Sequence, residues 1–523
     1  MRAPTGGAPT RPRTATSWRR LALASLALAL LLAAACTEDE PAEQPAEEPA
    51  EATAVATPEP TPTPPTSDAE ARQLLENLLE AGPNLELTVS TVERIIEARD
   101  YRFIAPFIEI IRASFHRAVQ GIESLNVIQD ALVAMSGVDL GPHWFGWFEW
   151  YAGTDLEPPP GFTAWKGQLM SRIDPLFEGF LYPDAPATIR VEEVVWGGVR
   201  VDGIPSLDNP RRLSPEEATY LDPNEPVFGI ALNGEAMAYP VRIMDWHELS
   251  NDVVGGVPVS LAYCTLCGAA IAFDGRAPDG NTYVFGTSGL LYRTNKLMYD
   301  RTTRSLWNQF TGRPVIGSLA ADPDAVQLDL LPVVTTSWRD WLEQHPETEV
   351  LDVRTGHDRV YEVFGQPYGD YFRTEEIRFP AFQRSDELHP KARVYGLRLG
   401  GIRKAWVIDD LVQEQVLNDE FAGSPIVLVA QRGLADVEDI LVRIPWPNYD
   451  YGGEVRSFER GRNTFSPGAD PDTVLDEDGA EWTVTEEALV GPDGERLDRV
   501  NGHIAFWLGW FLFFPEAELW RLN

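Results

Sequence analysis

Cysteine is almost absent from this chain, which has three in 523 residues. A closed zinc site built from two cysteine pairs is therefore excluded, because no second pair exists. Two of the three cysteines stand together in Cys264-Thr265-Leu266-Cys267-Gly268. This spacing is typical of a small redox disulfide or of two ligands to a metal ion.

Basic residues are also scarce. The chain has 43 Lys and Arg against 80 Asp and Glu, a formal net charge of −37. Such a charge argues against a nucleic-acid partner and against direct adhesion to anionic lipid. Acidity by itself favours solubility and identifies no partner.

Several common catalytic motifs are missing. Gly286-Thr287-Ser288-Gly289 is not the Gly-x-Ser-x-Gly nucleophile elbow. Neither a phosphate-binding loop nor a His-Glu-x-x-His motif is present. The polar segment Thr287–Trp307 is either the wall of a pocket or a well-determined hairpin. The cysteine pair is left as the motif that carries chemistry.

The N-terminus has a short apolar run, Leu21–Ala35, which follows a positive segment with Arg11, Arg13, Arg19 and Arg20. Fifteen residues are too few to span a bilayer as a helix, so the pattern predicts an export signal over residues 1–35. The run ends in Leu31-Leu32-Ala33-Ala34-Ala35-Cys36, which resembles the lipobox of bacterial lipoproteins. That resemblance implies acylation of Cys36 and a protein anchored through lipid to the outer face of the cytoplasmic membrane. Ordinary cleavage after an Ala-x-Ala-like site is the alternative.

Residues 36–67 predict a disordered tether. They are almost entirely Pro, Glu, Ala and Thr, with no aromatic residue. Such a segment cannot bury enough surface to offset the entropy of ordering it.

Residues 68–160 predict a helical accessory domain. Apolar residues recur three and four apart, and Pro83, Pro106 and Gly121 divide the region into short helices. The tryptophan-rich segment 144–151 is typical of an interdomain packing face.

From residue 189 to residue 523 the apolar pattern has a period of two, which predicts strands over 191–201, 227–232, 257–263 and 270–273. The expected fold class is therefore α+β, with a small all-α domain followed by a mainly-β body.

The β-body contains an internal repeat. It predicts two copies of one β-rich unit, about 189–350 and about 390–514, packed about a pseudo-twofold axis. The matched segments are Phe228–Gly234 with Tyr395–Gly401, Asn251-Asp252 with Asn418-Asp419, Gly256–Val259 with Gly423–Ile426 and, after a gap, Asp300–Trp307 with Asp476–Trp482.

The repeat separates residues that the fold requires from candidates for function. The second copy has Gln431-Arg432-Gly433-Leu434 where the first has Cys264 to Cys267, and Glu414 where the first has His247. The cysteines are therefore not required by the fold of the unit.

The same region resembles a known family. The resemblance rests on Asn251–Gly268, Gly286–Asn295 and Met298–Trp307, together with Asp386–Lys391 and Phe506-Trp507. These motifs are similar to those of an uncharacterised prokaryotic family, domain of unknown function 3179, over about residues 189–514. The resemblance implies an exported protein without an established activity. Some members carry selenocysteine in place of a cysteine of this motif, which implies redox chemistry.

A redox hypothesis makes Cys264 and Cys267 the catalytic pair of a thiol-dependent oxidoreductase with an unknown redox or protein partner. Outside the membrane no glutathione pool keeps thiols reduced, so the pair would rest oxidised or cycle with that partner. A reactive thiolate needs a helix N-terminus or a nearby cation. Arg293, Arg301 and His247 are the candidates for that role.

A metal hypothesis uses the same cysteines. Cys-x-x-Cys-Gly between two strands resembles a zinc or rubredoxin knuckle, and two thiolates with a histidine or methionine suit copper(I). His247 and one of Met298, His389 or Asp245 would complete a copper or zinc site. A third alternative is an extracytoplasmic binding or scaffold protein whose cysteine pair forms an incidental disulfide.

Overall fold

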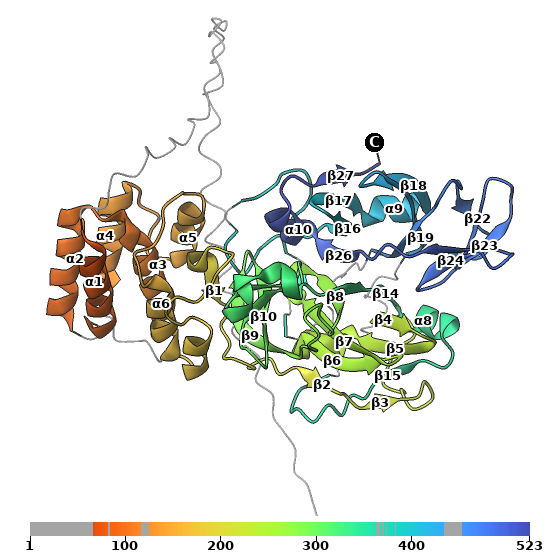
Figure 1. The fold of residues 1–523 in the computed structure, drawn as a ribbon, viewed down its shortest axis with the longest axis horizontal. Coiled ribbons are helices and arrows are strands. Elements are labelled where there is room, and N and C mark those ends of the chain that lie inside the picture. Colours follow the sequence, from red (N-terminus) through yellow and green to blue (C-terminus); the bar gives the residue numbers. More distant parts are fainter. Residues whose placement is uncertain are drawn as a thin grey trace, which may run out of the picture. The chain divides into compact units, whose positions relative to one another are not determined.

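The computed structural model describes residues 66–81, 84–116, 125–361, 367–368, 371–372, 374–381, 383–433 and 452–522 (Figure 1). The predicted export signal, the predicted lipidation site at Cys36 and nearly all of the predicted tether lie outside these residues, as do Pro83 and Gly121. Within the described part of the chain, no helix has both the length and the apolar character needed to cross a membrane.

The N-terminal region is helical, as the sequence predicts, but it continues beyond residue 160. Pro106 lies inside α3 and does not interrupt it, because in the first turn of a helix the missing N–H has no intrahelical acceptor. Among the described residues of this region the α-helices are α1 (Asp68–Ala81), α2 (Leu85–Ala98), α3 (Ile104–Ser114), α4 (Leu125–Ser136), α5 (Trp144–Ala152) and α6 (Phe162–Ser171).

The helical core continues into the first strands of the β-body. Trp144 and Trp147 of α5 belong to the same buried cluster as Val194 and Leu290. The guanidinium of Arg112 lies 4.5 Å from the ring centroid of Trp144, and it also donates a hydrogen bond to the carbonyl of Trp196. The tryptophan-rich segment thus packs where the helices meet the β-body.

The first copy of the repeat forms three sheets, with strand orders β14-β4-β5-β15-β3, β13-β8-β7-β6-β2 and β1-β9-β10-β11-β12. The strand predicted over 191–201 is much shorter than expected, because a 3-10 turn precedes it and turns follow it. The elements are β1 (Val194–Trp196), β2 (Leu207–Asp208), β3 (Arg212–Leu213), β4 (Pro226–Leu232), β5 (Glu235–Pro240), α7 (Val241–His247), β6 (Leu249–Val254), β7 (Val257–Cys264), β8 (Ala269–Asp274), β9 (Phe285–Tyr292), β10 (Asn295–Asp300), β11 (Leu306–Asn308), β12 (Arg313–Ile316), β13 (Leu330–Leu331), β14 (Val334–Ser337), α8 (Trp338–Gln344) and β15 (Glu349–Leu351).

The second copy has sheets ordered β26-β16-β17-β27, β18-β19-β20 and β21-β22-β23-β24-β25. Its elements are β16 (Arg393–Leu399), β17 (Ile402–Val407), α9 (Ile408–Glu414), β18 (Val416–Phe421), β19 (Ser424–Gly433), β20 (Gly453–Glu459), β21 (Ser466–Pro467), β22 (Thr473–Leu475), β23 (Glu481–Val484), β24 (Ala488–Val490), β25 (Arg496–Asp498), β26 (His503–Phe506), α10 (Trp507–Phe513) and β27 (Glu518–Trp520).

The two copies match element by element. The series β4-β5-α7-β6-β7 and β16-β17-α9-β18-β19 begin at residues related by one constant offset, so that Pro226 matches Arg393 and Val257 matches Ser424. In each copy a final parallel strand follows a tryptophan helix: β15 pairs with β5, and β27 pairs with β17. The predicted duplication is confirmed.

Shared residues make the same contacts in both copies. Asn251 exchanges two hydrogen bonds with the backbone of Phe285, and Asn418 does the same with Phe465. The indole N–H of Trp307 donates to Asp300 at 3.1 Å, and the faint echo of this segment in the second copy has an equivalent bond from Trp482 to Asp476 at 2.9 Å. These repeated contacts hold the unit together.

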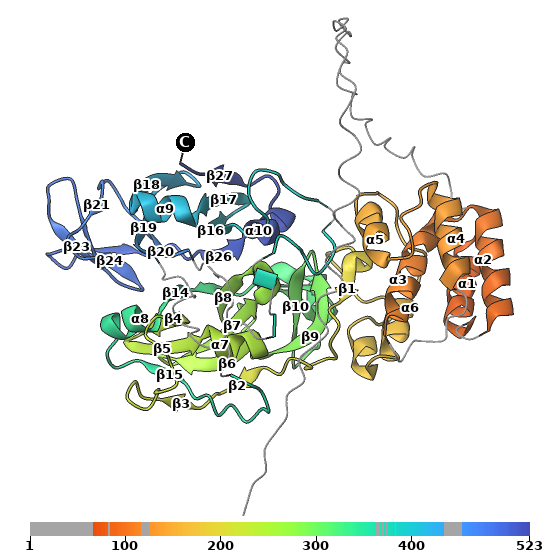
Figure 2. The same ribbon diagram turned by 180° about the vertical axis from the view of Figure 1, so that it is seen from behind.

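The copies also contact each other reciprocally. Strand β26 of the second copy lies against β8 of the first, and β14 of the first lies against β20 of the second (Figure 2). The helix α10 packs against the 3-10 turn that contains Cys267. Gln344 of α8 in turn donates a hydrogen bond to Asp472 of the second copy. A pseudo-twofold arrangement of the two copies requires reciprocal contacts of this kind.

Candidate functional site

The cysteine motif is a tight turn between two paired strands. Cys264 ends β7, Thr265–Cys267 form a 3-10 turn, and Ala269 begins β8 opposite Cys264. Gly268 has a φ of 56°. A Cβ atom at this position would lie 2.8 Å from the ring of Phe506, the last residue of β26. Only glycine suits both demands. The strand–turn–strand pattern predicted from the sequence is confirmed.

The two cysteines differ in their surroundings. Both are free thiols in the interior, near 3.5 Å apart. Cys267 has no exposed surface, and its sulfur contacts the carbonyl of Thr294 at 3.5 Å and the amide of Asn295 at 3.6 Å. Cys264 instead lines a cavity. One sulfur therefore faces open space, and its partner is enclosed behind it.

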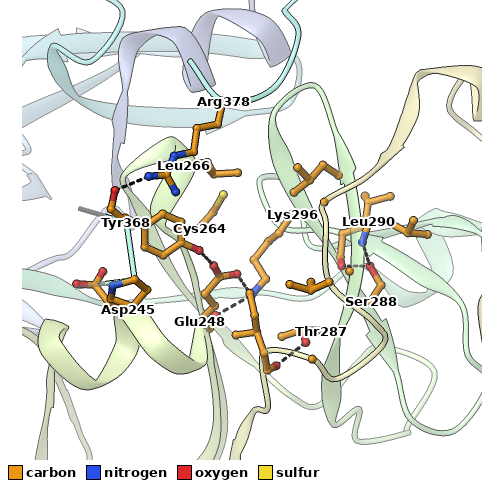
Figure 3. A pocket seen from close by; sticks show the side chains of 18 of the residues that line it. Asp245, Glu248, Cys264, Leu266, Thr287, Ser288, Leu290, Lys296, Tyr368 and Arg378 are labelled. Carbon is orange, nitrogen blue, oxygen red and sulfur yellow. Dashed lines mark hydrogen bonds and ion pairs between the residues drawn. The ribbon is translucent and has the colours of Figure 1, made fainter. Parts of the chain in front are cut away.

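The cavity has a volume of about 540 Å³ and is shown in Figure 3. Its wall is largely apolar, with charged side chains at a few positions. The segment Thr287–Trp307 contributes part of the wall and is also a β-hairpin, so both expectations for it hold. The lining includes Trp246, Glu248, Cys264, Leu266, Leu290, Lys296, Leu297, Arg359, Tyr368 and Arg378.

A buried charged group lies beside Cys264. The ammonium of Lys296 is 3.3 Å from the Glu248 carboxylate and donates to the Glu248 carbonyl at 2.8 Å. The hydroxyl of Tyr368 donates to the same carboxylate. Glu248 has a φ of 54° at the end of α7, and the matching Gln415 has a φ of 68°. The backbone is thus shared between the copies, while the charge belongs to the first copy.

These contacts shift the pKa values of the two thiols in opposite directions. Burial alone would raise the pKa of Cys264, but the hydrogen bond from Cys267, the backbone N–H of Lys296 and the Lys296 charge outweigh it, so the pKa is lowered. Burial raises the pKa of Cys267 well above its ordinary value, and the Cys264 thiolate raises it further. The pair is arranged so that Cys264 is the more acidic thiol and Cys267 donates a hydrogen bond to it.

The arginines predicted as helpers lie elsewhere. Arg293 contacts the Glu193 carboxylate at 3.3 Å and the Leu512 carbonyl at 3.0 Å. Arg301 contacts Asp202 at 3.2 Å and lines a different, smaller cavity. The cation beside Cys264 is Lys296, on the same hairpin. A lysine within the apolar strand segment Asn295–Asp300 was the signal available for it.

His247 is also placed apart from the thiols. Its Nδ1 contacts the Pro205 carbonyl at 2.7 Å, its Nε2 contacts the Tyr361 hydroxyl at 2.6 Å, and burial lowers its pKa to about 4. Met298 lies in the hydrophobic core, and His389 faces Glu375 at 3.6 Å.

Asp245 lines the same cavity as Cys264. Even so, no three His, Cys, Asp or Glu side chains of the described residues are gathered as a metal site. Copper or zinc binding stays a prediction without a supporting set of contacts.

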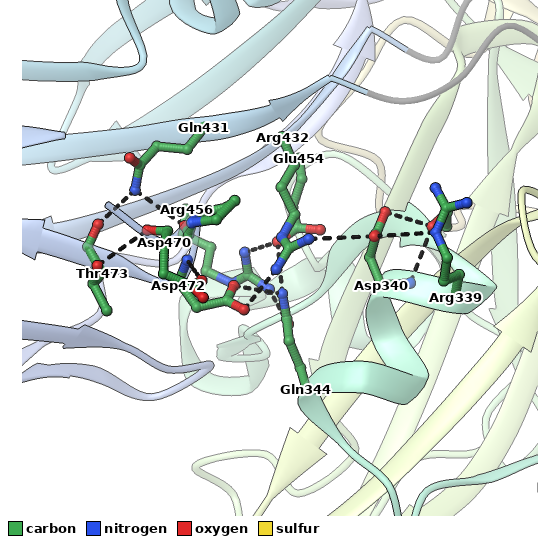
Figure 4. A network of polar contacts seen from close by, with 12 residues as sticks. Arg339, Asp340, Gln344, Gln431, Arg432, Glu454, Arg456, Asp470, Asp472 and Thr473 are labelled. Atoms are coloured by element: carbon green, nitrogen blue, oxygen red, sulfur yellow. Dashed lines mark hydrogen bonds and ion pairs between the residues drawn. The ribbon is translucent and has the colours of Figure 1, made fainter. Parts of the chain in front are cut away.

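The matching place in the second copy is filled by polar contacts (Figure 4). Gln431, opposite Cys264, donates to the carbonyl of Thr473 at 2.7 Å. Next to it, Arg432 pairs with Asp472 at 2.6 Å and with Asp340 at 3.2 Å. Arg456 forms ion pairs with Glu454 and with Glu486. Ion pairs and amide contacts occupy this place in the second copy.

Fold and site together define a class: a duplicated β-rich protein in which one copy carries a thiol-lined cavity. The chain belongs to a family of proteins of unknown function, DUF3179, whose model matches residues 201–517. This match confirms the resemblance found in the sequence motifs. Neither a curated protein nor a solved structure was found to match the chain.

Proposed function

We propose that Cys264 and Cys267 form a thiol–disulfide exchange site, with Cys264 as the attacking thiol. The observation that carries this proposal is the asymmetry of the pair: Cys264 lines the cavity, and Cys267 is enclosed and hydrogen-bonded to it. An attacking thiol must reach a substrate, and a resolving thiol must reach only the first sulfur.

The exchange proceeds in two displacements. The Cys264 thiolate attacks one sulfur of a substrate disulfide, a mixed disulfide forms, and the other half leaves as a thiolate that takes up a proton. Cys267 then loses its proton and attacks the Cys264 sulfur, which releases the second half as a thiol. Two electrons pass to the substrate, and the protein holds a Cys264–Cys267 disulfide. A dithiol reductant must restore the pair.

Lys296 supports the first displacement. Its ammonium lowers the pKa of Cys264, and its charge is held in place by Glu248 and Tyr368. A lower pKa increases the fraction of Cys264 present as thiolate but decreases the intrinsic nucleophilicity of that thiolate. The first effect is the larger one while the pKa stays above the ambient pH, because the optimum attacking thiol has a pKa near that pH.

Trapping experiments test this proposal. With 4,4′-dithiodipyridine, Cys267→Ser should accumulate one mixed disulfide per chain, at Cys264. The wild-type protein should release two equivalents of thiopyridone and end as an internal disulfide. Cys264→Ser should form no adduct in the time that Cys267→Ser needs to react completely. A Cys264 that remains unmodified in the folded protein, or a Cys267 that reacts first, would refute the proposal.

We also propose that this chemistry takes place outside the cytoplasmic membrane, on a protein anchored through acylated Cys36. The lipobox-like sequence before Cys36 supports this. Cys36→Ala should abolish incorporation of labelled fatty acid and release the protein from the membrane fraction. Fatty-acid labelling that persists in this variant would contradict the proposed anchor.

A further inference from the structure

We infer that the substrate of this site is a small disulfide with an apolar body and an anionic end, bound inside the cavity with its anionic end toward Arg378 and Arg359. The inference rests on the proposed exchange function. It adds a substrate class, which the Cys264–Cys267 chemistry alone does not specify.

Access to the sulfur limits the size of the substrate. Cys264 is only 2% exposed, so a disulfide must enter the cavity to reach it. The volume of about 540 Å³ falls within the roughly 300–1,000 Å³ typical of small-molecule sites. A disulfide on the surface of a folded protein would have to insert its polypeptide into this space. The recessed sulfur therefore favours a low-molecular-weight substrate.

The cavity wall selects an apolar body. Leu266, Leu290, Leu297 and the Trp246 ring line it, and the transfer of apolar surface from water to such a wall is favourable in proportion to the area buried. Lys296, a buried cation near the sulfur, is already paired with Glu248. The interior therefore offers little to a charged group on the substrate.

Two arginines of the wall are placed to bind an anion. The guanidinium of Arg378 lies 5.5 Å from the ring centroid of Tyr368 and 5.4 Å from that of Tyr371, and it donates to the Tyr368 carbonyl. The guanidinium of Arg359 lies 5.7 Å from the Trp246 ring and donates to the Asp358 carbonyl at 3.1 Å. Within the described residues, neither arginine pairs with a carboxylate.

Aromatic stacking orients these guanidiniums and leaves N–H groups available. A planar guanidinium with free N–H groups matches the geometry of a carboxylate or a similar anion. The net charge of −37 repels anions at long range, so binding of an anionic substrate requires local cations of this kind. Together the cavity fits an amphipathic anion that carries a disulfide.

The test uses Cys267→Ser, which stops the reaction at the mixed disulfide. Second-order rate constants are measured with 5,5′-dithiobis(2-nitrobenzoate), an anionic aryl disulfide; 4,4′-dithiodipyridine, a neutral one; cystamine, a cationic alkyl disulfide; and insulin, a protein disulfide. Each rate constant is divided by that of free glutathione with the same probe, which removes differences in intrinsic reactivity.

We expect the normalised rate for the anionic probe to exceed that of the neutral probe by at least tenfold and that of cystamine by more. In an Arg359→Gln/Arg378→Gln background the anionic advantage should disappear, while the neutral rate changes by less than twofold. Arg276→Gln, an exposed arginine outside the cavity, is the matched control and should change neither rate.

Two outcomes would overturn the inference and leave the exchange function intact: insulin reacting faster than the small probes, or an anionic advantage that survives the double substitution. If no probe forms a mixed disulfide at Cys264, the proposed function fails as well. The two failures are therefore distinguishable.

Discussion

The two copies of the β-unit share the series β4-β5-α7-β6-β7 and β16-β17-α9-β18-β19, and they differ where that series ends. At the end of β7 the first copy has a turn with Cys264 and Cys267 beside a cavity, whereas the last residues of β19 in the second copy include Gln431 and Arg432, which lie in a polar network. The residues that fold the unit, such as Asn251 and Asn418, make the same bonds in both. The two cysteines therefore belong to one copy only, while the strands that precede them occur in both copies.

The largest effect is expected at Cys264. Cys264→Ala should remove mixed-disulfide formation completely, because no other described sulfur lines the cavity. Gln431→Ala makes the matching change in the second copy and should leave the exchange rate within twofold. The measurement is the rate of thiopyridone release. Equal losses in both variants would mean that the copies do not differ in function as proposed.

The second largest effect is expected when Arg456, a buried arginine of the second copy, is replaced. Strand pairing places Arg456 opposite Val429, the position that Ile271 takes opposite Ala262 in the first copy. Arg456→Met would leave the buried Glu454 without its ion-pair partner, which costs about 3–5 kcal/mol of unfolding free energy. Urea denaturation measures the loss.

The double variant Arg456→Met/Glu454→Gln should recover part of that stability, since the uncompensated charge is gone. Folded Arg456→Met should exchange disulfides at the wild-type rate. A loss below about 1 kcal/mol would show that this network does not have the structural role assigned to it.

Two glycines should respond alike. A Cβ on Gly229 would overlap the Trp341 ring, and one on Gly396 would overlap the Trp510 ring. Each Gly→Ala substitution forces the tryptophan helix away from its sheet, at about 1–3 kcal/mol. Urea denaturation of the two single variants compares them. Clearly unequal costs would contradict the structural equivalence of the copies.

The smallest effect concerns the acidity of Cys264. Lys296→Met removes a charge that lowers this pKa, so the pKa should rise and the thiolate fraction below it should fall. Alkylation at pH 7 should therefore be slower when Lys296 is replaced by Met. Glu248→Gln installs the second copy's residue and should act in the opposite direction, because the Glu248 charge raises the pKa of Cys264.

The pH dependence of iodoacetamide alkylation, measured in the Cys267→Ser background, gives these midpoints. The sign is the discriminating result: alkylation that begins at higher pH for Lys296→Met and at lower pH for Glu248→Gln. Shifts in the same direction would indicate a general disturbance of the turn. The double variant then reports whether the two charges act on Cys264 independently.

Much of the fold could be predicted from local pattern. The helical N-terminal region, the duplication and the turn after β7 follow from apolar periodicity, matched segments and a glycine that must adopt positive φ. The end of the helical region and the length of β1 could not be, because neighbouring helices and strands stabilise or cap those segments through tertiary contacts.

The candidate site likewise has features that the sequence predicts and features that only tertiary contacts decide. The sequence by itself determined the cysteine pair, its place in one copy only and its position at the end of a strand, since backbone and spacing are local properties. Only the tertiary structure selected Lys296 over Arg293 and Arg301, because the three lie within nine positions on one hairpin and differ in what packs against them. Glu248, Tyr368 and Arg378 come from separate segments, and no local pattern brings them to one wall. The cavity that makes Cys264 different from Cys267 exists only because those segments meet.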